Sequence, residues 1–344
     1  MGEETAAKGE TAAKGGEEPD KEKKETESSV SAHSSAKAGE PKGTVADKEK
    51  KEAKKPAKKT AAKSKKKAAS KKKSAKGGEK APKSFVSKYH PRGKTKVIEA
   101  VKLYREFELS KNNIVKVVQG VSFDIYSGEF VMLHGPSGCG KSTILNMIAG
   151  LETVDKGKMK IRGKDLAKFS DDEMAEFRRT KIGIVFQSFN LLKSLTNQEN
   201  VALPLIADGE PRAKALKRGA SLLRMLGLGK HMNRVPTELS GGQQQRVAIA
   251  RSLAKNPWIV LADEPTGNLD SKSTEEVMDI FVTLNRKSKR TVVMVTHNPE
   301  HIQYADRIIF LKDGIVIDEK KNVRKVQEKE VEGFNTKRMA ISAQ

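Results

Sequence analysis

Short apolar runs, separated by polar and glycine-rich turns, organise the chain from about residue 94 onwards. Alternating or continuous apolar positions predict seven strands, over residues 97–104, 114–125, 129–133, 158–161, 182–186, 258–262 and 291–295. Helical spacing predicts helices over residues 141–150, 171–179 and 274–287. Two last apolar runs, 307–311 and 315–318, flank Asp313 and Gly314, a pair typical of a hairpin turn.

The order of these elements indicates an α/β fold. Strands that alternate with helices predict a mainly parallel sheet that is flanked by helices on both faces. The strand-rich beginning predicts an antiparallel β subdomain beside that sheet. Residues 197–229 form a charged block with a helical pattern, and we expect Pro204 and Pro211 to break it.

The first 90 residues differ in composition from the rest of the chain. They hold 25 lysines, no arginine and 14 acidic residues, and so carry +11 of the formal net charge of +23. Aliphatic and aromatic residues are rare there, so the segment buries too little apolar surface to offset its chain entropy. We therefore expect a disordered tail over residues 1–93, one domain over residues 94–321 and a charged appendage over residues 322–344.

The charge of the tail is divided along its length. Residues 1–41 are net acidic, whereas residues 42–90 hold 19 lysines against 4 acidic residues. Two interpretations stay open: a solvated tail that binds nothing in particular, and a contact with anionic lipid or nucleic acid. Lysine without arginine or interleaved aromatic residues argues against sequence-specific readout of a nucleic acid.

Cysteine content and hydropathy bear on the compartment. Cys139 is the single cysteine, so no disulfide forms within the chain, which fits a reducing cytosol. No apolar run approaches the roughly 18 residues that a membrane-spanning helix needs. If the protein works at a membrane, we expect another chain to cross it.

A glycine-rich loop lies between an apolar strand and a helix. Residues 135–142 read GPSGCGKS and fit the pattern G-x-x-x-x-G-K-[ST] of a phosphate-binding loop, typical of a P-loop NTPase. Its backbone N–H groups and the helix start favour phosphate, Lys141 is expected to reach the β- and γ-phosphates, and Ser142 to ligate Mg²⁺. The predicted ATP phosphate-binding residues are Gly135, Pro136, Ser137, Gly138, Cys139, Gly140, Lys141, Ser142 and Thr143.

Cys139 permits two interpretations within this loop. A nearby helix start and lysine can lower the pKa of a thiol, which would make Cys139 sensitive to oxidation. A cysteine that merely fills a permissive position is the alternative.

Two carboxylates follow the apolar run at residues 259–262. Asp263 and Glu264 stand at the carboxyl end of a predicted buried strand, where parallel α/β sheets place their ligands. Asp263 is the expected partner of Mg²⁺, and Glu264 is placed to accept a proton from an attacking water.

A second phosphate-directed loop identifies a resemblance. Residues 239–251 read LSGGQQQRVAIAR, which closely resembles the signature of ABC ATPases. In that family the signature faces the γ-phosphate held by the opposite subunit, so the resemblance implies a composite site. The residues that match it are Leu239, Ser240, Gly241, Gly242 and Gln243.

Further motifs of this family appear in order. Gln187 looks like the glutamine that contacts Mg²⁺ or the attacking water, and Asp270 in Asn-Leu-Asp resembles the D-loop that crosses the dimer. His297 resembles the switch histidine that touches the γ-phosphate. Tyr104 resembles the aromatic residue that stacks on adenine, with Phe107 as a competitor. The resemblance thus implies Glu264, His297 and Gln187 as catalytic residues.

The resemblance covers roughly residues 94–320 and implies an ATPase with ATP and Mg²⁺ as cofactors. The wording of residues 266–271 and 238–246 looks most like the lipoprotein-releasing and macrolide-export branch. It implies head-to-tail dimerisation, with a second copy or a paralogous ATPase, and a separate transmembrane permease on which the protein sits at the cytoplasmic face of the inner membrane. Residues between Gln187 and Leu239 would contact that permease. Phe189, Leu191 and Leu192 are the candidates for this contact, and a local hydrophobic cluster is the alternative interpretation of these three residues. Two alternatives stay open: a soluble ABC ATPase whose basic tail binds nucleic acid, and a cell-division-type scaffold.

Overall fold

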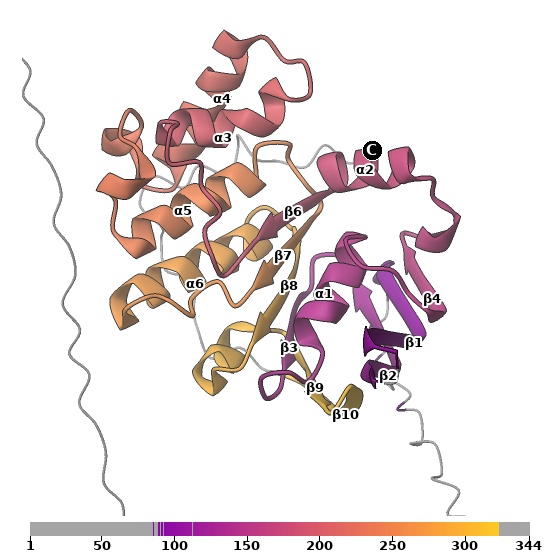
Figure 1. The fold of residues 1–344 in the computed structure, drawn as a ribbon. Coiled ribbons are helices and arrows are strands. Elements are labelled where there is room, and N and C mark those ends of the chain that lie inside the picture. The colour runs from indigo at the N-terminus through magenta and orange to yellow at the C-terminus, as the bar shows by residue number, and fades with distance from the viewer. Residues whose placement is uncertain (1–84, 86–88, 90, 92, 112, 323–344) are drawn as a thin grey trace, which may run out of the picture. The chain divides into compact units, whose positions relative to one another are not determined.

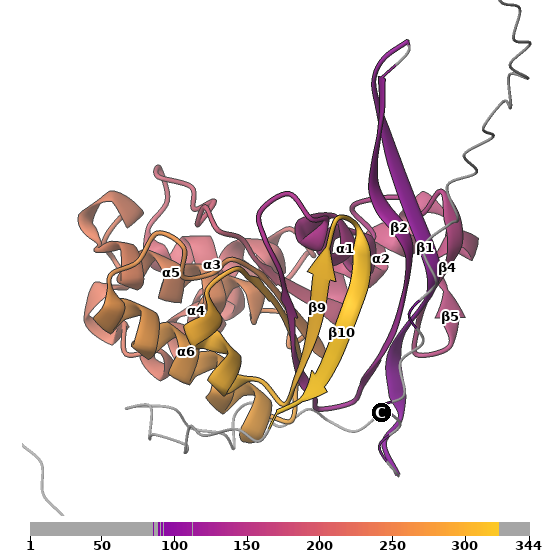
Figure 2. The same cartoon turned by 90° about the horizontal axis from the view of Figure 1, so that it is seen from below.

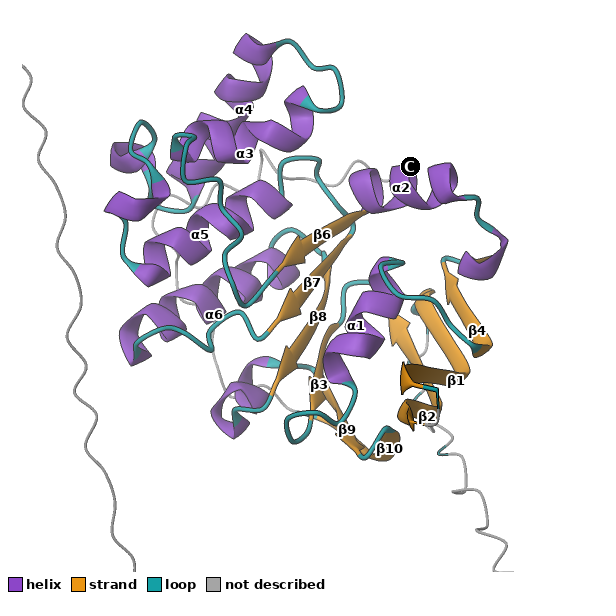
Figure 3. Ribbon diagram, viewed as in Figure 1, coloured by secondary structure: helices purple, strands orange, loops and turns teal. Residues whose placement is uncertain are grey.

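The computed structural model describes Phe85, Tyr89, Pro91, residues 93–111 and residues 113–322. The predicted tail, apart from Phe85, Tyr89, Pro91 and Gly93, and the predicted appendage beyond residue 322 lie outside the described residues. The described part combines a central sheet, a smaller antiparallel sheet and a group of helices (Figures 1 and 3).

The central sheet confirms the predicted parallel arrangement. Its strands are β3 (Phe130–His134), β6 (Ile182–Val185), β7 (Ile259–Asp263), β8 (Thr291–Thr296), β9 (Arg307–Lys312) and β10 (Ile315–Lys321). They follow the order β10-β9-β3-β8-β7-β6, and only β9 and β10 pair antiparallel. The predicted hairpin turn is present, because Asp313 and Gly314 both have positive φ, as a two-residue turn of this type requires.

Alternate residues of the central strands face two apolar cores. Val292 and Met294 of β8 pack into a core shared with α3 (Asn197–Ile206), α4 (Arg212–Met225), α5 (Gly241–Ser252) and α6 (Ser271–Arg286). Val293 and Val295 face the opposite core, which holds α1 (Lys141–Ala149) and the antiparallel sheet. Since neighbouring side chains of a strand point to opposite faces, one continuous apolar run supplies both cores.

The antiparallel sheet confirms the predicted β subdomain. It consists of β1 (Lys96–Ser110), β2 (Asn113–Tyr126), β4 (Lys156–Ile161) and β5 (Lys164–Asp165), in the order β2-β1-β4-β5. The helix α2 (Asp171–Lys181) follows, capped at its start by Ser170 and Glu173. β1 and β2 run on together beyond the other strands, as Figure 2 shows.

The helical block was predicted with one error. Pro204 lies inside α3 and does not break it. It stands in the last turn, where the missing N–H removes a single backbone hydrogen bond. The chain leaves the helical path after Ile206 and turns at Gly209, which has a φ of 82°, before α4 begins after Pro211. Among the described residues, none of the helices combines the length and apolar character that a bilayer crossing requires.

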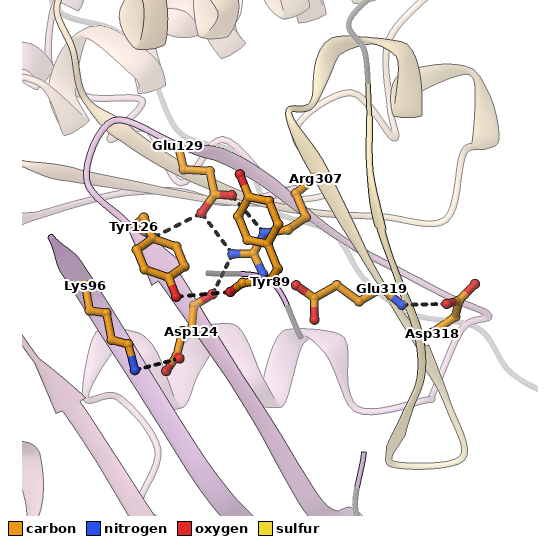
Figure 4. A network of polar contacts seen from close by, with 8 residues as sticks. All are labelled: Tyr89, Lys96, Asp124, Tyr126, Glu129, Arg307, Asp318 and Glu319. Atoms are coloured by element: carbon orange, nitrogen blue, oxygen red, sulfur yellow. Dashed lines mark hydrogen bonds and ion pairs between the residues drawn. The ribbon is translucent and has the colours of Figure 1, made fainter. Parts of the chain in front are cut away.

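A buried ion pair lies at the amino-terminal edge of the central sheet (Figure 4). Arg307 is fully buried and donates to both carboxylate oxygens of Glu129, at 2.8 and 2.9 Å. Burial alone would lower the pKa of Arg307, but the hydrogen bonds of Glu129 and Glu319 hold it above its ordinary value. The ring of Tyr89 covers this guanidinium at 4.6 Å, so contacts with the domain begin before the predicted boundary at residue 94.

Candidate functional site

The predicted catalytic residues gather at the carboxyl edge of the central sheet. β3, β7 and β8 are neighbouring parallel strands, and their ends lead into the phosphate loop, Glu264 and His297. Ligands of parallel α/β sheets bind at this edge. The sequence motifs, although separated by more than 100 residues, therefore meet in one place.

Glycine allows the phosphate loop to approach its neighbours closely. Gly140 precedes α1 with a φ of 95°, and a Cβ on it would lie 2.6 Å from the carbonyl oxygen of Val117. A Cβ on Gly135 would overlap the carbonyl of Leu311. Both positions therefore require glycine, as a loop whose backbone turns toward phosphate demands.

Lys141 lies beneath this loop with its ammonium group held by carbonyl groups. Its Nζ donates to the carbonyl oxygens of Gly135, at 2.9 Å, and Pro136, at 2.7 Å. The side chain is 5% exposed. This placement fits its predicted role toward the β- and γ-phosphates.

Cys139 is buried, and burial raises the pKa of its thiol although the charge of Lys141 opposes this. A raised pKa disfavours the thiolate, which is the reactive form. Burial therefore favours the interpretation of Cys139 as a residue that fills its position over the oxidation-sensitive one.

Two of the three residues expected to hold Mg²⁺, Ser142 and Asp263, are in direct contact. The hydroxyl of Ser142 donates to Oδ1 of Asp263 at 2.9 Å. Burial raises the pKa of Asp263, and Glu264 adds to this. A hydroxyl and a carboxylate are ligands that Mg²⁺ prefers, so the pair fits the ion. The described residues contain no group of three or more His, Cys, Asp or Glu side chains that could cage a metal. Phosphate oxygens would supply the remaining ligands.

Glu264 and His297 form the second contact of the edge. Nδ1 of His297 lies 2.9 Å from Oε1 of Glu264, and the His297 side chain is 54% exposed. Glu264 has a φ of 43°, a backbone conformation that is uncommon for residues other than glycine. Both residues line a cavity of about 470 Å³ together with Leu269, with residues of the first turns of α6 and with residues that follow β8.

Gln187 stands near the same carboxylate. Its Nε2 is 3.1 Å from the point where a Cβ of Gly267 would lie, and Oε2 of Glu264 is 3.7 Å from that point. The side chain of Asn268 donates to the carbonyl oxygen of Gln187 at 3.5 Å. Gln187, Glu264 and the residues before Asp270 thus share one corner of the site.

The signature loop is folded as a helix cap. Ser240 accepts from the N–H of Gln243, whose side chain accepts from the N–H of Ser240 in return. A Cβ on Gly242 would lie 2.5 Å from Oγ of Ser273, so the loop packs against the start of α6. Asp270 caps that helix through Ser273, and this hydrogen bond lowers the pKa of Asp270.

Within one chain, the phosphate loop and the signature loop precede helices that pack on opposite faces of the central sheet. α1 belongs to one core and α5 to the other. Within the described part of the chain, no hydrogen bond or ion pair joins residues 239–243 to residues 135–143. A phosphate loop and the signature loop of the same chain are therefore apart, whereas the predicted composite site needs one loop of each kind around the same phosphates.

The aromatic residues of β1 differ in their surroundings. Tyr104 is 37% exposed, and its hydroxyl lies 2.9 Å from the point where a Cβ of Gly120 would be. Phe107 has one ring face covered by the guanidinium of Arg105, at 4.6 Å. The arrangement favours Tyr104 over Phe107 for stacking, and that role stays a prediction.

Sequence reasoning gave no role to Arg251, in the last turn of α5. Its guanidinium donates to the carbonyl oxygens of Phe189, at 3.0 Å, and Asn190, at 2.6 Å. Burial lowers the pKa of Arg251. The contact ties the segment after Gln187 to the signature helix. The available signal was an arginine at the end of an otherwise apolar helical run, which is too common to assign a partner.

Comparisons with known proteins identify relatives of the same kind. Residues 118–267 match the family model described as ABC transporter. An uncharacterised ABC transporter ATP-binding protein of Methanocaldococcus jannaschii is 47% identical over 222 residues, which cover 64% of this chain and 98% of that protein. The macrolide export ATP-binding/permease protein MacB of Chlorobaculum tepidum is 43% identical over 65% of this chain, but over 34% of its own length.

A solved structure extends the likeness to three dimensions. The dimeric structure of an ATP-binding cassette in a post-hydrolysis state, bound to ADP and Pi, shares 43% sequence identity with this chain. The match covers 65% of this chain and 98% of that one, with a TM-score of 0.61.

Proposed function

Because the chain belongs to the ATP-binding proteins of ABC transporters and is an ABC ATPase, we propose that it drives a separate transmembrane permease. In this proposal, ATP closes two cassettes head to tail, and hydrolysis reopens them. The second cassette is another copy of this chain or a paralogous ATPase. The permease would convert the cycle into export or release of a lipoprotein.

The observation that carries the composite site is the separation of the two loops. The phosphate loop and Glu264 lie at one edge, whereas Ser240 opens α5 from the opposite core. A second cassette can place its own signature loop opposite the phosphate loop. The dimeric ADP-bound relative supports this arrangement.

The residues at the carboxyl edge of the central sheet have separate roles in ATP binding and hydrolysis. The N–H groups of the phosphate loop and Lys141 bind the β- and γ-phosphates. Ser142, Asp263 and Gln187 would hold Mg²⁺, which supplies charge neutralisation on the phosphate oxygens. Oε1 of Glu264 contacts His297, which fixes the carboxylate so that it can accept the proton of the attacking water.

A surface for the permease is proposed next to Gln187. Phe189 and Leu191 are half-buried, Leu192 is 46% exposed, and Arg251 holds the backbone of this segment. Apolar side chains on a loop with a fixed backbone can contact the permease and transmit its movement to the neighbouring Gln187. The chain would then lie on the cytoplasmic face of the inner membrane. The similarity to MacB, whose name joins ATP-binding and permease, supports a permease partner and the export branch.

Glu264→Gln tests the composite site. The variant keeps the shape of the side chain but loses the base, so hydrolysis should fall by about 10²–10⁴-fold while ATP binding remains. With ATP it should elute as a dimer in size-exclusion chromatography with light scattering. The matched control is Glu300→Gln, an exposed carboxylate that lines the same cavity and should stay active. A monomeric, active Glu264→Gln protein would overturn the proposal.

Affinity purification tests the permease. Tagged Glu264→Gln protein is solubilised from membranes with ATP, and co-purifying proteins are identified by mass spectrometry. Recovery of a multi-span membrane protein supports the proposal. Recovery of nucleic acid or soluble proteins alone, lost when residues 1–84 are deleted, contradicts it.

A further inference from the structure

The hairpin of β1 and β2 continues beyond the antiparallel sheet. β1 pairs with β4 only as far as Tyr104, opposite Lys156. From there on its strand neighbour is β2, with pairs that run from Phe107 and Val115 to Ser110 and Asn113. We call residues 105–111 and 113–116 the hairpin arm. Figure 2 shows it projecting past α1 and past the turn between β9 and β10.

A carboxylate fixes the base of the hairpin arm. Asp155 accepts from the N–H of Glu106 at 2.7 Å and from Arg105 at 2.5 Å, and its own N–H donates to Tyr104 at 3.1 Å. Glu152 pairs with Arg105 as well, at 2.5 Å. An isolated two-stranded hairpin is marginally stable in water. These contacts therefore hold the hairpin arm in a defined direction.

The hairpin arm exposes apolar side chains on both of its faces. Leu109 is 68% exposed, Ile114 59% and Val115 40%. Neighbouring strand residues point to opposite faces, so Ile114 and Val115 lie on different sides. A group of exposed apolar residues on a fixed projection is typical of a contact surface.

The hairpin arm leaves the domain beside the phosphate loop. Val117 follows the last residue of the hairpin arm, and its carbonyl oxygen would lie 2.6 Å from a Cβ on Gly140 of the phosphate loop. At about 3.3 Å per residue, the strand extends roughly 15 Å beyond that point. The proposed second cassette must reach this same edge with its signature loop, so the hairpin arm continues that interface.

We propose that the hairpin arm is a contact surface for a second copy of this chain, closing over the helical region that presents the partner's signature loop. The inference rests on the proposed function. Leu109, Ile114 and Val115 carry no hydrogen-bonding groups that could recognise a nucleotide base, and one flat base cannot cover both faces. A protein surface can.

Threonine substitutions in the hairpin arm test the contact. Leu109→Thr, Ile114→Thr and Val115→Thr, combined in the Glu264→Gln protein, remove apolar surface and keep strand-forming side chains. Sedimentation velocity with ATP should show a dimer dissociation constant raised at least about tenfold. Leu151→Thr, at an apolar residue that is 50% exposed after α1, is the matched control and should leave the dimer unchanged.

Affinity for ADP separates this role from base recognition. Calorimetric titration of the triple variant should give an affinity for ADP within about twofold of the Glu264→Gln protein. An equal loss of ADP affinity would show that the hairpin arm serves the nucleotide and would overturn the inference.

A photo-reactive benzoylphenylalanine in place of Leu109 locates the contact. Irradiation with ATP should give a cross-linked dimer whose linked peptide lies within residues 197–252 of the second copy. A triple variant that dimerises normally, or a probe that reacts only with other proteins, refutes the contact while the composite site stands. If Glu264→Gln itself never dimerises, the proposed function fails first, and the two failures are thus distinguishable.

Discussion

At the scale of single residues, the contact between His297 and Glu264 explains how one carboxylate is aimed. The 2.9 Å distance leaves the other oxygen of Glu264 on the side of Gly267 and Gln187. A carboxylate held through one oxygen keeps the second in a constant position. The His297 side chain is 54% exposed, so it makes this contact from the open side of the edge.

His297→Ala should therefore reduce turnover without unfolding the protein. Loss of the group that orients the base is expected to lower kcat by about 10²-fold or more. Thermal unfolding should change little, because an exposed side chain contributes little packing. Steady-state ATPase assays and calorimetry measure both. Gln303→Ala, in the same cavity, is the control. Full activity of His297→Ala would contradict the assigned contact.

His301 predicts a dependence of stability on pH. It is 4% exposed, its Nδ1 lies 3.2 Å from Oγ1 of Thr296, and burial lowers its pKa. In the unfolded chain the imidazole of His301 takes up a proton near pH 6.5, whereas in the folded protein it does so only at a lower pH. The free energy of unfolding therefore falls as the pH drops below about 6.5. In His301→Gln this contribution, up to about 1.4 kcal/mol per pH unit, should disappear. Urea unfolding between pH 5 and 8, at steps of about one unit, measures it. Parallel curves for both proteins would refute the assignment.

The residues that sequence could identify are those whose chemistry depends on a local motif. The phosphate loop and the pair Asp263 and Glu264 are read from adjacent positions and a preceding strand. Arg251 could not be assigned, because its partners are backbone carbonyls some 60 residues earlier. The two interpretations of Cys139 could not be separated from the sequence for a similar reason: burial of the thiol is set by distant residues, and its effect on the pKa outweighs that of the nearby lysine.

At the scale of elements, apolar periodicity located the strands and most helices within a few residues. Pro204 misled the prediction, because a proline in the last turn removes little from a helix that is already ending. The length of β1 was also underestimated, because it was predicted to end at residue 104 and continues to Ser110. Its outer part is exposed, so burial does not produce the alternation that a strand usually shows.

Asp155→Asn tests what fixes the hairpin arm. Hydrogen bonds from Glu106 and Arg105, against the opposing effect of burial, hold the pKa of Asp155 below its ordinary value. The stabilisation is thus complete above about pH 4 and is lost as the pH falls through the lowered pKa. At neutral pH the substitution should speed hydrogen exchange in residues 105–116, measured by mass spectrometry. Asp165→Asn, which removes the charge from a carboxylate that likewise accepts from a backbone N–H, that of Ala167, should leave that peptide unchanged. Unaltered exchange in Asp155→Asn would contradict the anchor.

At the scale of the whole molecule, the two edges of the central sheet differ in function: the edge with the phosphate loop carries the predicted catalytic residues, and the edge with Tyr89 carries a buried ion pair. Parallel strands carry the catalytic residues at their carboxyl ends. Arg307 and Glu129 lie at their amino-terminal ends, with the ring of Tyr89 over the guanidinium of Arg307 (Figure 4). The described chain therefore joins the domain at the edge away from the chemistry. The lysine-rich segment before it can be removed in an experiment without cutting into the site.

Two truncations separate the tail from this anchor. Removal of residues 1–84 keeps Tyr89, whereas removal of residues 1–93 deletes its ring over Arg307 and the carbonyl that accepts from the hydroxyl of Tyr126 at 3.1 Å. We expect the shorter deletion to leave the free energy of unfolding unchanged. The longer one should lower it by at least about 1–3 kcal/mol, the sum of a desolvated cation–π contact and a hydrogen bond, because it also removes Phe85, which packs against the core of the antiparallel sheet and α1. Urea unfolding measures both. Tyr89→Ala in the full chain keeps the backbone carbonyl and should reproduce the part of the loss that comes from the ring over Arg307. Equal stability of the two truncated proteins would mean that Tyr89 contributes nothing. A loss in the shorter one would place stabilising contacts within residues 1–84.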